Sequence, residues 1–299
     1  MTRAIETIEI LNLVDGNVTG AGAIHLLGEA GYSALVKVTY DDTSKFTFLF
    51  DTGISRIVLT HNMAQLDKDL STVQLIVLSH GHYDHVGGLI EALALTGKKT
   101  PVLCHPDALL SKTFKSDDGK KHEIGTPRYF SEDSLRRKTE VITTRDSYEI
   151  ADGIMTTGEV PRTNDFEKLS GILLKISTVQ GGKEVPDPVM DDLSVVFRLK
   201  DGSIVILAGC CHAGIVNTID HAIKLTGSSS IVGIVGGLHL NDASKYRLTK
   251  TIERLMDFPL SKLAPSHCTG LRGRAALLQA FEDKFMDVGA GSVIKFQSA

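Results

Sequence analysis

The feature that most constrains the fold is a short aliphatic run followed at once by a cluster of potential metal ligands. Leu75-Ile76-Val77-Leu78 predicts a buried strand, and it leads into Ser79-His80-Gly81-His82-Tyr83-Asp84-His85. Side chains two positions apart on an extended chain point the same way, so His80 and His82 can converge on one ion. Asp84 and His85 lie where the chain turns toward Gly87-Gly88, and they can face a second ion. The sequence therefore predicts a metal site at a strand-to-helix loop rather than a polar turn with chance histidines.

Strand-like and helix-like segments alternate in two similar halves. Short runs rich in β-branched residues predict strands at 5–14, 33–40, 46–50, 75–78, 102–105, 141–144, 154–157, 172–177, 194–199, 204–208, 231–235 and 263–265. Helical periodicity predicts helices at 88–96, 213–225, 242–257 and 272–288. Two sheets packed face to face, with helices on both outer faces, satisfy this order and define an α+β fold. No proline- and glycine-rich linker divides the chain, so we expect one domain over 1–299, with its longest loop at 181–192.

The composition excludes several classes of protein. The chain has 299 residues, 42% of them hydrophobic, which is long enough to bury a large core. A net charge of −4 with mixed signs lacks the basic stripe of a nucleic-acid binder; the locally basic segment 112–138 predicts a solvated loop or a surface helix. No apolar run approaches the roughly 20 residues of a membrane span, and the N-terminus lacks the apolar core of a signal peptide. Four sparse cysteines form no disulfide framework, so we expect a cytoplasmic protein without nucleic-acid or membrane partners.

The segment from Ser79 to His85 resembles the H-x-H-x-D-H signature of the metallo-β-lactamase superfamily. Further matches in the expected order extend the resemblance over essentially the whole chain. The resemblance implies an αββα four-layer sandwich with two metal ions at one edge, between the sheets. It also implies that Asp51 orients a metal-binding residue from behind, that His105 is structural, and that His267 is the late histidine of the second metal site.

Two positions depart from the commonest pattern of this superfamily. The third histidine of the first metal site usually stands in a Gly-His-x-Pro context, where this chain has Gly158-Glu159-Val160-Pro161. The bridging aspartate usually follows a strand and a glycine, where this chain has Cys210, whose thiolate can ligate zinc. His212, two residues after Cys210, competes with Glu159 for the third place, and the sequence favours neither.

Three further segments narrow the resemblance to one subgroup. These segments are residues 157–162, residues 209–217, and Gly236-Gly237-Leu238-His239-Leu240. They resemble the 7,8-dihydropterin-6-methyl-4-(β-D-ribofuranosyl)aminobenzene-5′-phosphate synthases, transferases of methanopterin-type cofactor biosynthesis. His239 could bind a substrate phosphate or donate a proton, or it could be structural. Arg162 could bind an anionic substrate, or it could be an ordinary surface arginine.

The resemblance implies an enzyme that uses two divalent metal ions on a small, anionic or phosphorylated substrate. Imidazole and thiolate ligands favour zinc, whereas a ligating Glu159 would make manganese or iron credible. Asp84 is the candidate to accept or relay a proton beside the metals. The alternative to the synthase is a metal-dependent hydrolase of a phosphodiester, lactone or other ester, and a non-catalytic binding protein is a third reading. His82 argues against the di-iron redox members, which carry glutamate at that position.

Overall fold

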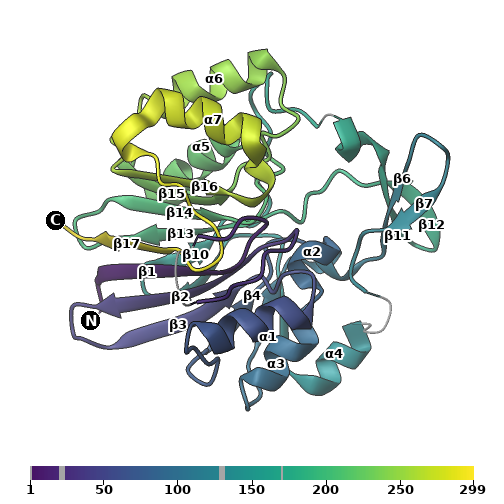
Figure 1. Cartoon of the computed structure of the whole chain (residues 1–299), viewed down its shortest axis with the longest axis horizontal. Coiled ribbons are helices and arrows are strands. Elements are labelled where there is room, and N and C mark those ends of the chain that lie inside the picture. Colours follow the sequence, from purple (N-terminus) through teal and green to yellow (C-terminus); the bar gives the residue numbers. More distant parts are fainter. Residues whose placement is uncertain (1, 20–23, 128–131, 170) are drawn as a thin grey trace.

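Two mixed β-sheets pack face to face at the centre of the computed structural model, which describes residues 2–19, 24–127, 132–169 and 171–299 (Figure 1). The first sheet has the strand order β17-β1-β2-β3-β4-β5-β8. Its strands are β1 (Ile5–Val14), β2 (Ser33–Tyr40), β3 (Lys45–Phe50), β4 (Leu75–Val77), β5 (Val102–Cys104), β8 (Val141–Thr143) and β17 (Val293–Gln297). β3, β4, β5 and β8 run parallel to one another, while β17, β1 and β2 pair antiparallel.

The second sheet has the order β16-β15-β14-β13-β10-β9. Its strands are β9 (Tyr148–Ala151), β10 (Ile154–Thr156), β13 (Ser194–Arg198), β14 (Ile204–Ala208), β15 (Ile231–Gly237) and β16 (Lys262–Ser266). β14, β15 and β16 are parallel. Side chains at the carboxyl ends of parallel strands meet at one edge of a sheet, which is where open α/β structures bind ligands.

Helices cover the outer face of each sheet and complete four layers (Figure 1). α1 (Arg56–Gln65), α2 (Tyr83–Val86), α3 (Leu89–Leu95) and α4 (Glu132–Lys138) lie beside the first sheet, and α5 (Ile215–Thr226), α6 (Lys245–Leu255) and α7 (Gly270–Phe281) cover the second. One apolar cluster, including Phe48 and Phe197, fills the space between the sheets. Two more lie under the helices, around Leu59 on one side and Ile219 on the other. The expected αββα sandwich is confirmed.

A small third sheet projects from the sandwich, and we call it the arm (Figure 1, right). Its order is β12-β11-β6-β7, from β6 (Lys112–Lys115), β7 (Lys121–Glu123), β11 (Ile176–Gln180) and β12 (Lys183–Pro186). The prediction of a solvated loop or surface helix at 112–138 holds for the surface helix α4 but is wrong for strands β6 and β7. The predicted long loop at 181–192 is partly strand β12.

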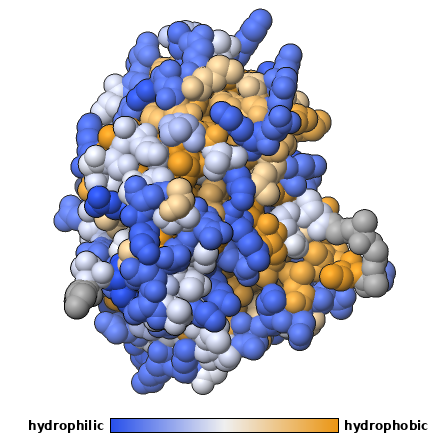
Figure 2. Space-filling view, turned by 90° about the vertical axis from the view of Figure 1, so that its left-hand side faces the viewer, coloured by the Kyte–Doolittle hydropathy of each residue, from blue (hydrophilic) through white to orange (hydrophobic). Residues whose placement is uncertain are grey.

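Short 3-10 turns connect the longer elements: η1 (Pro106–Leu109), η2 (Gly171–Lys175), η3 (His267–Thr269) and η4 (Glu282–Lys284). Most atoms on the left of the space-filling view are hydrophilic, and hydrophobic atoms form a band through its centre and right (Figure 2). None of the helices in the described ranges combines the length and the hydrophobicity that crossing a bilayer requires.

Candidate active site

Three buried histidines form the first candidate metal group. His80 follows β4, His82 stands at the N-terminus of α2, and His212 lies in the turn between β14 and α5. Nε2 of His80 lies 2.9 Å from Nδ1 of His82 and 3.2 Å from Nε2 of His212. The structure therefore brings together the first two histidines of the motif with one of the two rival third ligands.

The electrostatics of this group suit a cation. Burial lowers the pKa of His82 to about 4. Burial, reinforced by the neighbouring imidazoles, also holds the pKa values of His80 and His212 well below the ordinary range. Neutral imidazoles offer a lone pair, which is the form that binds a metal ion. Nε2 of His82 and Nδ1 of His212 are buried and have no hydrogen-bond partner among the described residues, so this pocket leaves polar atoms that an additional ligand could satisfy.

The second group joins Asp84 and His85 of the motif to His267, which follows β16. Nε2 of His85 lies 3.2 Å from Nε2 of His267 and 3.7 Å from Oδ2 of Asp84. The same Asp84 oxygen lies 3.5 Å from Nε2 of His267. Burial opposes ionisation of Asp84, but the two histidines lower its pKa overall. Burial likewise disfavours the His85 imidazolium, yet Asp84 and Asp51 raise its pKa to about 9.

Asp51, at the end of β3, holds His85 from behind. Its Oδ2 lies 2.7 Å from Nδ1 of His85 and accepts a 2.7 Å hydrogen bond from Oγ of Ser79. The backbone N–H of Ser79 donates to the other Asp51 oxygen over 2.7 Å. A carboxylate in this place would keep the proton on Nδ1, which would leave Nε2 free to bind a metal ion.

Cys210 lies between the two groups. Its thiol is buried, and Sγ lies 3.2 Å from Nε2 of His85. Its sulfur is close enough to share an ion with His80 and His212 or with His85 and His267. A Cβ on the preceding Gly209 would come within 2.2 Å of Oγ of Ser79, so glycine is required for β14 to approach the motif. Burial raises the pKa of the Cys210 thiol, and a bound cation would deprotonate it.

His239 and Cys268 lie next to these groups, and Cys268 was not predicted from the sequence as a site residue. Both side chains come close enough to Cys210 for the three to hold an ion together. Burial alone would raise the pKa of Cys268, but Cys210, His267 and His239 hold it well below the ordinary range. The signal that could have found Cys268 was its position directly after His267.

Glu159 lies in a different set of contacts. Its Oε1 lies 3.0 Å from Nε2 of His105 and accepts a 2.7 Å hydrogen bond from Arg145. Among the described residues, each three-ligand group that could hold an ion lacks Glu159. The geometry thus brings His212, and not Glu159, to the motif histidines. Arg162 donates to the carbonyl of Val189 over 3.1 Å.

The turn that carries His212 is fixed by a buried carboxylate. Glu167 accepts hydrogen bonds from the backbone N–H groups of Val216 (3.0 Å) and Asn217 (2.8 Å). These two N–H groups belong to the first turn of α5, where backbone donors have no acceptor within the helix and a negative charge is favourable. Gly214 has a φ of +96°, and a Cβ there would meet the Glu167 side chain at 2.2 Å. Glycine therefore lets the helix begin directly behind His212.

Backbone strain concentrates at this site. Asp51, Cys211, His239 and His267 have φ values of +58°, +58°, +46° and +47°. Left-handed conformations of non-glycine residues cost of order 1 kcal/mol or more each and persist where the surroundings enforce them. Each of these residues follows the carboxyl end of β3, β14, β15 or β16, so the strain turns the chain toward the site.

A cavity of about 670 Å³ opens over both groups. One wall consists of site residues, and the other comes from the arm. The lining residues are His82, Tyr83, Asp84, Phe114, His122, Glu123, Ile124, Ile172, Leu173, Ile176, Cys210, His212, His239, His267 and Cys268. A small-molecule substrate of ordinary size fits such a volume.

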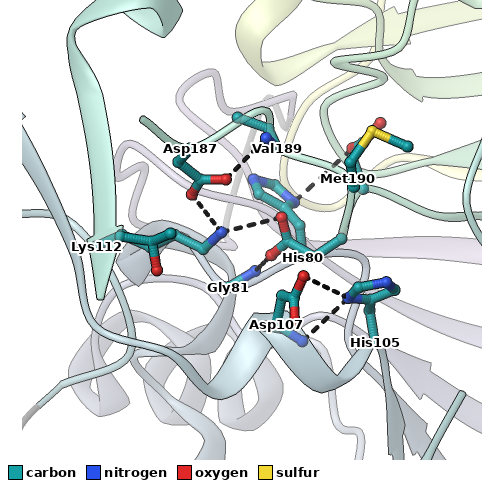
Figure 3. A network of polar contacts seen from close by, with 12 residues as sticks. His80, Gly81, His105, Asp107, Lys112, Asp187, Val189 and Met190 are labelled. Atoms are coloured by element: carbon teal, nitrogen blue, oxygen red, sulfur yellow. Dashed lines mark hydrogen bonds and ion pairs between the residues drawn. The ribbon is translucent and has the colours of Figure 1, made fainter. Parts of the chain in front are cut away.

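A buried ion-pair network ties the arm to the motif (Figure 3). Nζ of Lys112 lies 2.6 Å from Oδ2 of Asp187 and 3.0 Å from Oδ1 of Asp191. The other Asp191 oxygen accepts a 2.8 Å hydrogen bond from the backbone N–H of Gly81, between the first two histidines. Burial opposes the charge on Lys112, but the two carboxylates raise its pKa overall, so the amine stays protonated.

Imidazole, carboxylate and thiol groups that converge at the edge of an αββα sandwich define a metal-dependent enzyme. The donor set fits divalent cations. The model of the metallo-beta-lactamase superfamily matches residues 28–267. The chain therefore belongs to the metallo-beta-lactamase superfamily, whose members generally bind divalent metal ions.

Two curated relatives come from Methanocaldococcus jannaschii. The chain is 30% identical over 268 residues to its 7,8-dihydropterin-6-methyl-4-(beta-D-ribofuranosyl)-aminobenzene-5′-phosphate synthase, covering 89% of this chain and 90% of the relative. It is 33% identical over 254 residues to the uncharacterized protein MJ0448, covering 83% and 87%. Among solved structures, Tm1679, a metal-dependent hydrolase of the beta-lactamase superfamily, matches with a TM-score of 0.78 and 26% identity over 97% of this chain and 100% of that one.

Proposed function

We propose that this chain is a transferase that joins a dihydropterin to 4-(β-D-ribofuranosyl)aminobenzene 5′-phosphate. The observation that carries the proposal is the 30% identity to the named synthase over 89% of the chain. The site chemistry supports it, because a cavity beside metal ligands suits a phosphorylated small molecule. The amine nitrogen would displace a leaving group from the pterin 6-methyl carbon and release one proton.

We assign His80, His82 and His212 to one ion, and Asp84, His85 and His267 to a second, with Cys210 between them. Zinc is the first choice because imidazole and thiolate ligands favour it, with manganese and iron as the alternatives. We do not assign Glu159 to either ion, because its carboxylate is already engaged by His105 and Arg145.

The bound ions would supply positive charge that polarises substrate oxygens and acidifies bound water. Asp84 is the proposed acceptor for the proton that the amine releases, since its carboxylate lines the cavity and stays ionised. His239 is the proposed proton donor to the leaving group, from the same cavity wall. We further propose that residues 1–299 act as one domain, because both halves supply ligands, and that the protein is cytoplasmic, where its free thiols stay reduced.

A hydrolase is the second candidate, and the resemblance to the hydrolase Tm1679 favours it. Such an enzyme would use the same ligands to attack a phosphodiester, lactone or other ester.

The deciding experiment incubates the metal-loaded chain with the aminobenzene phosphate and a dihydropterin that carries a leaving group on its 6-methyl carbon. Mass spectrometry should detect the coupled product, and Asp84→Asn should abolish it. The alternative result is a metal-loaded protein that forms no coupled product and hydrolyses a generic phosphodiester or lactone. That result would contradict the synthase proposal and support the hydrolase.

A further inference from the structure

A row of three side chains crosses the arm at matching positions. In the ladder register, Phe114 of β6 lies opposite His122 of β7 on one side and opposite Ile176 of β11 on the other. Residues directly opposite one another in a sheet project from the same face. The rings of Phe114 and His122 are stacked, with centroids 6.1 Å apart and planes inclined by 27°. The arm thus presents an aromatic and aliphatic surface made by Phe114, His122 and Ile176, which we call the ring row.

The ring row faces the metal ligands. All three of its members line the cavity whose opposite wall carries His82, Asp84 and the other site residues. Lys112 lies two residues before Phe114 on the same strand and so shares its face of the sheet. Because Lys112 is pinned to Asp187 and Asp191, this face is held toward the motif.

The chemistry of the cavity divides into two parts. Its site wall offers imidazoles, a carboxylate and thiols, while its other wall adds the ring row, the carboxyl group of Glu123 and the apolar side chains of Ile124, Ile172 and Leu173. Among the described residues that line it, none is lysine or arginine. An anionic substrate group would therefore bind to metal ions held by the site wall, and the ring row with its apolar neighbours suits an uncharged ring.

We propose that the ring row binds a flat heteroaromatic ring of the substrate by stacking, with the reacting substituent pointing at the metal ligands. This inference rests on the proposed function for the identity of the ring, a pterin. Phe114 is partly exposed and His122 exposed, so both rings have a free surface to offer. Stacking on aromatic side chains tolerates varied rings and strengthens binding substantially.

The test measures binding of two probes to the full, metal-loaded chain. Pterin, whose fluorescence is quenched on stacking, reports on the ring row, and inorganic phosphate reports on the metal wall alone. Phe114→Ala and His122→Ala should each weaken pterin binding roughly tenfold, while Phe114→Tyr should retain it. Phosphate affinity and metal content should not change in any of these variants.

Val179→Ala is the matched control, because Val179 is an exposed apolar side chain of the arm that does not line the cavity. It should leave both probes unaffected. Unchanged pterin affinity in Phe114→Ala and His122→Ala would overturn the inference, as would a wild-type chain that binds phosphate but no pterin. The ring variants could lose affinity for pterin while the wild-type chain fails to couple the two precursors. That outcome would support the ring row as a binding surface and contradict the synthase proposal.

Discussion

Nδ1 of His85 lies 2.7 Å from Oδ2 of Asp51, and neither side chain is exposed to solvent. The carboxylate therefore fixes the orientation of the imidazole without needing to touch an ion. Such partners behind a ligand typically change metal affinity by about 10- to 100-fold when they are replaced.

Asp51→Asn should lower the affinity for one of the two metal ions by about tenfold or more. Asparagine tolerates the positive φ of this position, so the fold should survive. Metal titration followed by elemental analysis measures the effect, with the exposed Asp165→Asn as control. If Asp51→Asn binds both ions with the affinity of the wild-type chain, this carboxylate plays no part in metal binding.

The two ion positions should respond differently to acid. Carboxylates raise the pKa of His85 to about 9, so below that pH a proton competes with the second ion. In the metal-free chain the His85 imidazolium contributes stability that is fully present below the ordinary pKa of about 6.5 and is lost as the pH rises through about 9. The pKa of His82 is about 4, so the first group stays unprotonated to much lower pH. Dialysis from about pH 8 to about pH 5 should release the ion of the second group before that of the first group. Release of both ions at the same pH would contradict this order.

His212→Ala should remove most of the ion bound by the first group, since it takes away one of three imidazoles. Glu159→Gln should leave the metal content unchanged, because this carboxylate contacts His105 and Arg145 instead. Elemental analysis of both variants compares them directly. Metal loss in Glu159→Gln with retention in His212→Ala would reverse the assignment.

Cys210→Ser should abolish thiolate coordination. Cobalt(II) bound to the wild-type chain should show a sulfur-to-metal charge-transfer band in the near ultraviolet, and the variant should lack most of it. Cys104→Ala is the control, because Cys104 lies buried in β5, in the apolar cluster under the first layer of helices. An unchanged band in Cys210→Ser would exclude this thiol as a ligand.

Lys112→Met should destabilise the fold by about 3–5 kcal/mol, because it leaves two buried carboxylates without their cation. Lys175→Met breaks the exposed pair with Asp117 and should cost about 0–1 kcal/mol. Chemical unfolding of the two variants measures the difference. A loss no larger than that of Lys175→Met would show that the network contributes little to stability.

The sequence predicted the sandwich and the motif well because both are locally encoded. The strand from Leu75 to Leu78 is uniformly apolar, and the histidines that follow it need nothing distant to be recognised. The resemblance supplied Asp51 and His267, which the structure brings to His85 from different sheets.

The arm and the place of Cys268 in the site were not predicted, and the physical reasons differ. β6 and β7 are short and polar, and Phe114 is their only large apolar residue, so neither strand has a hydrophobic period. β6 and β7 pair with each other, but the sheet is completed by β11, whose Ile176 lies 62 positions after its partner Phe114, and by the buried ion pair of Lys112. Cys268 had a local signal in its position directly after His267, but the direction of its side chain depends on the left-handed backbone of His267.

The ligand groups draw on both sheets, since His80 and His212 touch although 132 residues separate them. An ion shared by these two side chains would act as a removable cross-link that closes a long loop of the unfolded chain. For loops of this size a permanent cross-link stabilises by roughly 4–5 kcal/mol in the chain-entropy model. The two halves of the sandwich should therefore unfold in one transition when the metal ions are bound. Removal of the ions by a chelator should lower the melting temperature and reduce the cooperativity of unfolding.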